Sequence, residues 1–331
     1  MIPPGPLAEI WRGDILESQH LGHIVVCDAS GDIVFELGDP DKTILPRSSC
    51  KMVQAIPLIE SGAADAFGLT DRQIALACAS HEALKIHTDA VQSWLRALGL
   101  GDDDLRCGPR WPEDPATARA MAVDGQTPCR YHNTCSGKHS GFLTLSQHLG
   151  GGPEYIDIGH PVQLAMRTAI EDLTQTTSPG HVVDGCSAPN FATTMRGLAR
   201  AMAAFSSPSG NHARSKAMRR IIHAVQTRPE MIAGDGFDCT EIMRAATGGT
   251  VVKFGAEGVY VATLPAQRLG IAIKCEDGAK RGALIAVLAM LVRFGAIPPD
   301  HPTVTGRMRA PILSKSGIHA GHMQPAPGLV P

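Results

Sequence analysis

Residues 250–275, TVVKFGAEGVYVATLPAQRLGIAIKC, contain three short runs rich in β-branched residues and separated by turn-forming residues. The runs are Thr250 to Lys253, Val259 to Thr263 and Leu269 to Cys275. Such runs between Gly- and Pro-containing turns are typical of antiparallel strands. The segment therefore predicts three strands in the last third of the chain.

A second pair of strands is predicted near the other end of the chain. His23 to Gly38 reads HIVVCDASGDIVFELG, in which Ser30-Gly31-Asp32 forms the turn of a hairpin. Two strands alone are marginally stable, so the hairpin needs partners. We expect it to pair with the three distant strands, which gives an antiparallel sheet of about five strands built from both chain ends.

The chain between these strands has the 3.6-residue apolar period of helices. An antiparallel sheet with a large helical insertion is an α+β architecture. We expect a single domain, 1–331, in which 22–47 and 250–296 form the sheet region with its final helix, 48–249 are mostly helical and 298–331 form an irregular tail. The expected helices cover Ser49 to Ser61, Arg72 to Cys78, His87 to Leu98, His160 to Leu173, Met195 to Ala204, Ser215 to Val225 and Ala279 to Phe294.

The composition argues against several classes of protein. With 30 Lys and Arg against 32 Asp and Glu, the net charge of −2 does not provide the positive field that nucleic-acid binding requires. The longest apolar stretch, Ala283 to Leu291, is well short of the ~18 residues of a membrane helix. The N-terminus does not resemble a secretory signal, so we expect a cytoplasmic protein whose nine cysteines are reduced.

The segment Arg47-Ser48-Ser49-Cys50-Lys51 follows a predicted strand and opens a predicted helix. Ser48 and Lys51 are three residues apart and so share one face of the first helical turn. There a neutral lysine can accept the proton of the serine hydroxyl, and free N–H groups can bind an oxyanion. The same spacing also fits a serine N-cap followed by a solvated lysine.

A second serine and a second lysine fit the same chemistry. Ser80 lies in Cys78-Ala79-Ser80-His81-Glu82, where an apolar helix ends abruptly in polar residues. Either the Ser80 side chain faces a cleft, or Ser80 has only a structural role at the end of the helix. Lys253 lies within a β-branched run, where a buried ammonium is costly; the alternative is an edge strand that exposes it.

Two further segments are rich in thiols and turn-forming residues. They are His132 to Gly141, HNTCSGKHSG, and Asp184 to Asn190, DGCSAPN. Cys135 and Cys186 are candidate zinc ligands, with His132 or His139 as a third. Asp184 would then orient a water molecule. Neither segment has the close ligand spacing of familiar zinc motifs, so turn-forming loops are the alternative.

Seven strings of the sequence, taken in order, resemble the Rhizobium etli-type L-asparaginases, also called class 3 or the L-asparaginase II family. The similarity runs from about Gly22 to Leu291. The order of a serine–lysine pair, a second serine and a Lys-x-Gly strand also resembles serine β-lactamases, penicillin-binding proteins and serine-dependent glutaminases. The strings are PRSSCKMVQAIPL, CASHEALKIH, LRCGPRWP, NTCSGKHSGFL, DGCSAPNF, RPEMIAGDGFDCTEIMRA and KFGAEGVYV.

The resemblance implies hydrolysis of L-asparagine to L-aspartate and ammonia, on a β-lactamase-like fold and by a homodimer. It assigns catalytic residues, zinc ligands and a neighbouring carboxylate by position. These are the tandems Ser48 with Lys51 and Ser80 with Lys253, the zinc ligands Cys135, Lys138 and Cys186, and Asp184 near the substrate. The implied zinc ion aids substrate affinity and does not activate the nucleophile. A lysine ligand must be neutral, so zinc occupancy would depend on pH.

Substrate contacts are also expected from Arg47, for an anionic group, from Asp184, for the ammonium group or a zinc-bound water, and from Lys138. The sequence departs from β-lactamases in two places. Ser80-His81-Glu82 stands for their S-D-N motif and Lys253-Phe254-Gly255 for K-T-G, so β-lactam chemistry is not expected.

The expected mechanism is acyl transfer. Ser48 Oγ attacks the carboxamide carbon, neutral Lys51 accepts its proton and Ser80 relays a proton to the departing ammonia. One alternative is a glutaminase or broader amidase, because one methylene changes binding by only about 1–3 kcal/mol. Another is a zinc-dependent hydrolase that uses a metal-activated water. A thiol or metal-storage protein is a third, but it leaves the serines and lysines unexplained.

Overall fold

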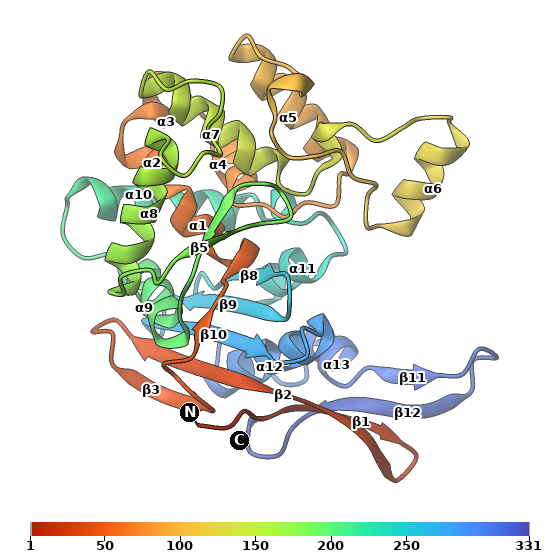
Figure 1. Ribbon diagram of the computed structural model, residues 1–331. Helices are drawn as coiled ribbons and strands as arrows, with labels where there is room; N and C mark the ends of the chain where they lie inside the picture. Colours follow the sequence, from red (N-terminus) through yellow and green to blue (C-terminus); the bar gives the residue numbers. More distant parts are fainter. Residues whose placement is uncertain (1, 331) are drawn as a thin grey trace.

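The two predicted strand regions pair with each other (Figure 1). The computed structural model describes residues 2–330. β2 pairs with β3, its hairpin partner, and with β10 from the distant region, where Ile24 lies opposite Ile273. All pairs in this eight-stranded sheet are antiparallel, so the expected α+β class is confirmed. In the order β11-β12-β1-β2-β10-β9-β8, with β3 beside β2, the strands are β1 (Gly5–Arg12), β2 (Ile15–Asp28), β3 (Ile33–Leu37), β8 (Val251–Gly255), β9 (Val259–Leu264), β10 (Leu269–Cys275), β11 (Pro311–Leu313) and β12 (His319–Pro325).

The sheet is larger than predicted because both chain ends add strands to it. The expectation of an irregular tail over 298–331 is wrong, since this segment contains α13 (Pro302–Met308), β11 and β12. β12 pairs with β1, with Ala8 opposite Pro325. The strand propensity of the Pro- and Gly-containing tail is weak, and its strands depend on a partner more than 300 positions away in sequence.

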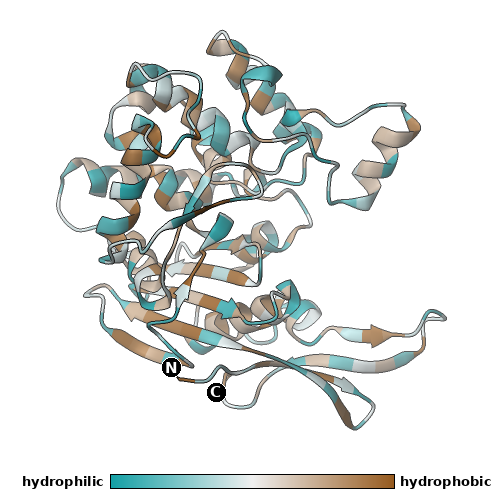
Figure 2. Cartoon of the chain, viewed as in Figure 1, coloured by the Kyte–Doolittle hydropathy of each residue, from teal (hydrophilic) through white to brown (hydrophobic). Residues whose placement is uncertain are grey.

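The central strands are covered on both faces. Every residue of β9 is buried, which requires both faces to be covered because successive side chains point to opposite sides. α9 (Met195–Ser206) packs on β10 and β2, and α12 (Lys280–Arg293) packs on β1, β9 and β10. Gly270 permits the close approach of α9, because a Cβ there would overlap the backbone of Ala203. Figure 2 shows the apolar colouring of these strands.

The middle of the chain forms the helical region beside the sheet (Figure 1). The helix predicted over Ser49 to Ser61 is divided at Ala55, because Pro57 has no N–H to continue the hydrogen-bond ladder. Among helices not predicted, α7 replaces the alternative of a turn-forming loop after Cys135. No helix within residues 2–330 is long and apolar enough to cross a membrane. The bounds are α1 (Lys51–Gln54), α2 (Ile56–Glu60), α3 (Ala63–Ala66), α4 (Asp71–Ala77), α5 (Lys85–Ala97), α6 (Pro115–Val123), α7 (Ser136–His148), α8 (Pro161–Thr174), α10 (Ala213–Thr227) and α11 (Asp238–Ala245).

Strand β8 meets the turn that carries Ser48 at Gly255. A Cβ on Gly255 would lie 2.8 Å from the carbonyl oxygen of Pro46 and 2.9 Å from the backbone nitrogen of Ser49. These are backbone atoms, so a change of rotamer cannot relieve the contact. Arg47, between them, has a φ of 53°, in the left-handed region. The backbone around Ser48 is therefore fixed by its packing on the sheet.

The substitution Gly255→Ala should destabilise the protein by about 1–3 kcal/mol, because the new methyl group forces the strand and the turn apart. Urea unfolding measures the change. Gly306→Ala is the matched control: Gly306 lies within α13, and a Cβ there would meet no atom within 4 Å apart from its chain neighbours and the backbone of its own helix, so alanine should be neutral or slightly stabilising. An unchanged free energy of unfolding in the Gly255 variant would contradict the close packing.

Candidate active site

Most of the site residues predicted from sequence line one cavity of about 180 Å³. This volume is below the usual range of pockets for drug-sized ligands and suits a small metabolite. The sequence analysis did not single out other polar residues of the lining, among them Glu82, Arg110, Glu113 and Asn133. The predicted residues that line it are Arg47, Ser48, Ser80, Cys135, Asp184 and Cys186.

Two lysine side chains converge on the hydroxyl of Ser80. Lys253 Nζ donates to Ser80 Oγ at 2.8 Å and to the Phe254 carbonyl oxygen at 2.7 Å. Lys51 Nζ lies 3.1 Å from Ser80 Oγ and also donates to the Ala79 carbonyl oxygen. Both lysines are almost completely buried. Lys253 thus combines the two alternatives from sequence, because it is buried although β8 is an edge strand.

The charge on Lys253 is disfavoured by its surroundings. Burial, and then the nearby charge of Lys51, lower the pKa of Lys253 from 10.5 to about 7. A large share of Lys253 is consequently neutral at physiological pH. A neutral amine at 2.8 Å from a hydroxyl is placed to accept its proton.

Ser48 lines the cavity at the first turn after β4 (Thr43–Ile44), but the contact expected between Ser48 and Lys51 is not formed. Within residues 2–330, the Ser48 hydroxyl makes no hydrogen bond to Lys51, whose amine is instead held by Ser80 and Ala79. The N-cap alternative is also not observed, because no side-chain cap is present at this turn. The two serines share the cavity, and Ser80 alone is in contact with both amines.

Cys135, Lys138 and Cys186 form a buried cluster beside the cavity. Lys138 Nζ donates to Cys186 Sγ at 3.0 Å. A hydrogen bond from Cys135 and the charge of Lys138 lower the pKa of Cys186 well below its usual value, despite burial. The hydrogen bond to Cys186, together with burial, raises the pKa of Cys135 to about 12. The cluster therefore brings the sulfurs of Cys135 and Cys186 and the Lys138 amine together, and Cys186 is the thiol that loses its proton more readily than usual.

The two histidines considered as third zinc ligands lie outside this cluster. His132 Nδ1 accepts a hydrogen bond from the backbone N–H of Cys129 at 3.1 Å. His139 Nδ1 lies 2.8 Å from the hydroxyl of Tyr155. The residue that contacts Cys186 is Lys138, which is next to His139 on α7.

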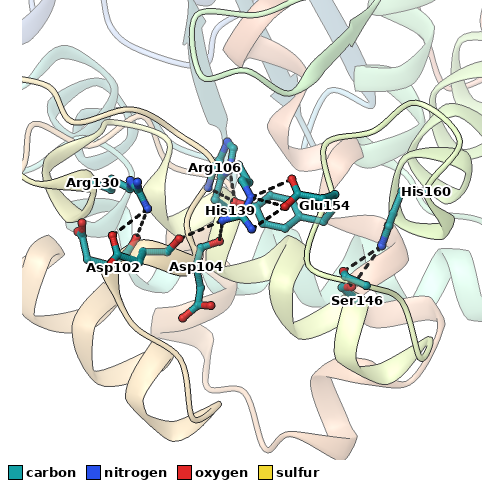
Figure 3. A network of polar contacts seen from close by, with 11 residues as sticks. Asp102, Asp104, Arg106, Arg130, His139, Ser146, Glu154 and His160 are labelled. Atoms are coloured by element: carbon teal, nitrogen blue, oxygen red, sulfur yellow. Dashed lines mark hydrogen bonds and ion pairs between the residues drawn. The ribbon is translucent and has the colours of Figure 1, made fainter.

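A network of polar contacts holds the beginning of α7, which carries Lys138 (Figure 3). The Tyr155 hydroxyl accepts a hydrogen bond from the backbone N–H of Arg106 at 2.6 Å, so its own proton is free for His139. The Arg106 guanidinium forms an ion pair with Glu154, with the closest N–O distance at 2.8 Å. These contacts hold His139, the residue that follows Lys138 on α7.

Asp184 is already paired with a cation. The Arg47 guanidinium donates to Asp184 Oδ1 at 2.6 Å. Burial acts to raise the pKa of Asp184, but the charges of Lys138 and Arg47 outweigh it and lower this pKa below 3.8. The expected anion-binding residue and the expected ammonium-binding residue thus bind each other.

The cluster of Cys135, Lys138 and Cys186 fits a zinc ion chemically, since two sulfurs and one amine are suitable ligands and the pKa of Cys186 is lowered, which favours the thiolate that zinc binds. Lys138 and Cys135 would have to lose protons on binding. A separate group that meets distance criteria for a metal, His20, Cys275 and Asp277, has its donors hydrogen-bonded to one another, and Arg281 donates to His20 Nε2 at 2.7 Å. That guanidinium opposes a second cation there.

A family model described as L-asparaginase II matches residues 8–325. Among solved structures, the chain is similar to a β-lactamase from Mycobacterium bovis, with 14% identity, a TM-score of 0.43 and coverage of 82% of this chain and 94% of that one. It is also similar to an octameric penicillin-binding protein homologue from Pyrococcus abyssi, with 12% identity, a TM-score of 0.45 and coverage of 86% and 76%. No match was found among curated proteins.

The depressed pKa of Lys253 predicts a pH-dependent contribution to stability. Between about pH 7 and the unfolded-state value, the unfolded chain binds a proton at this position that the folded chain does not, so this residue makes stability rise with pH. The stability of Lys253→Met relative to wild type should therefore fall by about 3 kcal/mol between about pH 6.5 and about pH 9.5. Urea unfolding across this range provides the measurement. Lys315→Met, at an exposed lysine, is the control. A difference independent of pH would contradict the shift.

Proposed function

Because the chain belongs to the L-asparaginase II family, we propose that it hydrolyses L-asparagine to L-aspartate and ammonia through a serine acyl-enzyme. The family makes it an amidohydrolase; the substrate and the serine–lysine mechanism are the proposal. The observation that carries it is the Ser80 hydroxyl held by Lys51 and Lys253, in a cavity that Ser48 also lines. Its small volume favours an amino acid over a larger amide.

The attack transfers one proton and forms one carbon–oxygen bond, which gives a tetrahedral intermediate. Ser48 Oγ attacks the side-chain carboxamide carbon, its proton passes to Ser80 Oγ, and the proton of Ser80 passes to neutral Lys253 Nζ. Burial, and then the nearby charge of Lys51, keep the pKa of Lys253 low. This route replaces the direct transfer from Ser48 to Lys51 expected from the sequence, because Lys51 contacts Ser80.

The second half of the reaction returns the proton. Collapse of the tetrahedral intermediate breaks the carbon–nitrogen bond, and the Lys253 ammonium protonates the departing nitrogen through Ser80, which leaves ammonia and an aspartyl ester on Ser48. Water then attacks the ester and gives one proton to Lys253 by the same route; the second tetrahedral intermediate collapses with cleavage of the bond to Ser48 Oγ, which takes that proton back through Ser80. The products are L-aspartate and the free Ser48 hydroxyl, so atoms and protons balance.

Zinc has a supporting place in this proposal. Cys135, Lys138 and Cys186 would hold it at the wall of the cavity, next to Asp184. When bound, the ion supplies positive charge that attracts polar groups of the substrate. Without the ion, the positive charge of Lys138 offsets negative charge on Cys186. The proposed serine–lysine steps do not involve the ion.

Ser48→Ala should lower the rate of ammonia release from L-asparagine by at least about a thousandfold, because the nucleophile is lost. The rates of Ser80→Ala and Lys253→Met should fall nearly as far, since Ser48, Ser80 and Lys253 act as one unit. Ser49→Ala is the matched control: the Ser49 hydroxyl donates to Pro46 O at 2.6 Å, and its loss should reduce stability more than rate. The assay is ammonia and aspartate release, with glutamine as the comparison substrate.

Acid quenching during turnover, followed by peptide mass analysis, should locate the aspartyl ester on the peptide with Ser48. An ester on the peptide with Ser80 would exchange the roles of the two serines. Ammonia release in a folded Ser48→Ala variant at the wild-type rate would contradict the acyl-enzyme proposal, and faster release from glutamine would favour a glutaminase.

Zinc binding should release about two protons per ion near neutral pH, one from Lys138 and one from Cys135, because both must be deprotonated to coordinate. Calorimetric titration in two buffers of different ionisation enthalpy measures this number. Cys186→Ser should weaken binding strongly, whereas Cys129→Ser, at a thiol outside the cluster, should not. Binding without proton release would contradict the ligand set.

A further inference from the structure

Glu82 is an acidic residue of the cavity that the proposed mechanism does not use. It follows Ser80 by two positions, in the extended connector between α4 and α5. The backbone N–H of Ser80 donates to Ile232 O at 3.0 Å, and that of Glu82 donates to Ala233 O at 3.2 Å. Because side chains two apart on extended backbone point to the same side, Ser80 and Glu82 both face the cavity.

The residue between them fixes this orientation. His81 is completely buried on the opposite side of the connector. Its Nδ1 accepts a hydrogen bond from the backbone N–H of Ala83 at 3.1 Å, so its Nε2 carries the proton that is donated to Ser136 Oγ at 2.8 Å. Backbone and side-chain contacts on both sides of Glu82 therefore hold it in the cavity wall.

The carboxyl group of Glu82 is without a partner. Its Oε2 is buried and makes no hydrogen bond with any residue in the range 2–330, and the side chain forms no ion pair within that range. The other acidic residues of the cavity are paired, Asp184 with Arg47 and Glu113 with Arg110. Because the Glu82 side chain lines the cavity, a donor bound there would meet a carboxyl group that no residue in the range 2–330 has paired.

The charges around Glu82 favour a cationic ligand. Burial, and then the neighbouring Glu113, raise the pKa of Glu82 to about 7, with Asp114 acting in the same direction. The cations Lys280 and Arg110 act in the opposite direction but are insufficient to restore the usual value. A positively charged group bound beside the Glu82 carboxyl group would stabilise its ionised form.

We propose that Glu82 binds the α-ammonium group of the substrate, the role that the sequence suggested for Asp184. This inference rests on the proposed function and extends it to substrate selection. With its ammonium group at Glu82, the substrate lies in the same cavity wall region as Ser80, so that its carboxamide can reach the two serines. The site would then select amides that carry an α-amino group over those that lack one.

The test compares L-asparagine with succinamate, which has the same skeleton without the ammonium group. Glu82→Gln keeps the size of the side chain and removes its charge. We expect its KM for asparagine to rise by about 10- to 100-fold, as for the loss of a charge-assisted hydrogen bond, with kcat changed by only a few-fold. For succinamate, kcat/KM should be unchanged or higher. Glu82→Asp, which keeps the charge, should recover part of the affinity for asparagine.

Glu113→Gln is the matched control, because Glu113 lines the same cavity but is paired with Arg110. This substitution should change kcat/KM for asparagine and for succinamate by the same factor. Three results would each overturn the inference. In folded Glu82→Gln, these are an equal loss of kcat/KM for asparagine and succinamate, or an unchanged KM for asparagine. In Glu113→Gln, it is a selective loss of kcat/KM for asparagine as large as that in Glu82→Gln. If Glu82→Gln does not fold, a KM for asparagine unchanged in Glu82→Asp would overturn it as well. Wild-type protein that releases ammonia from neither amide would instead contradict the proposed function.

Discussion

Two lysine amines buried against one serine hydroxyl form the constraint around which the rest of the site is organised. Lys51 and Lys253 are almost completely buried, so each amine depends on a few fixed protein oxygens. Two ammonium groups cannot both be accommodated there at low cost. One amine therefore yields its proton near neutral pH. Lys51 lies on α1, Ser80 follows α4, and Lys253 lies on the edge strand β8. The site is therefore complete only when these three elements pack together.

The sequence predicted those parts of the fold that depend on local pattern. The strands around Ile24 and Ile273 are rich in β-branched residues, and their pairing followed from the marginal stability of an isolated hairpin. β12 has no such pattern and exists because β1 offers it a partner. The broken helix near Ala55 could have been inferred from Pro57, because the missing N–H is a local property.

The chemistry of the site was predicted unevenly for a related reason. Residue types and order identified the serines, the lysines and the thiols, but spacing along a helix does not determine which oxygen a flexible amine selects. Lys51 contacts Ser80, which is 29 positions away, and not Ser48. The significance of Glu82 was not visible either, because an unpaired carboxyl oxygen is defined only by the absence of neighbours in three dimensions.

The charges of the cavity are divided between two functions. Arg47 is paired with Asp184, and Lys138 contacts Cys186, so neither pair offers a full charge to a ligand. Lys253, by contrast, loses its charge near neutral pH, and Glu82 has a carboxyl group that no residue in the range 2–330 pairs. A zwitterion that enters this cavity would find the unpaired carboxyl group of Glu82 available to its ammonium group. Orientation of the substrate would then follow from which charges the protein leaves unpaired, and not from the number of charges that it places in the cavity.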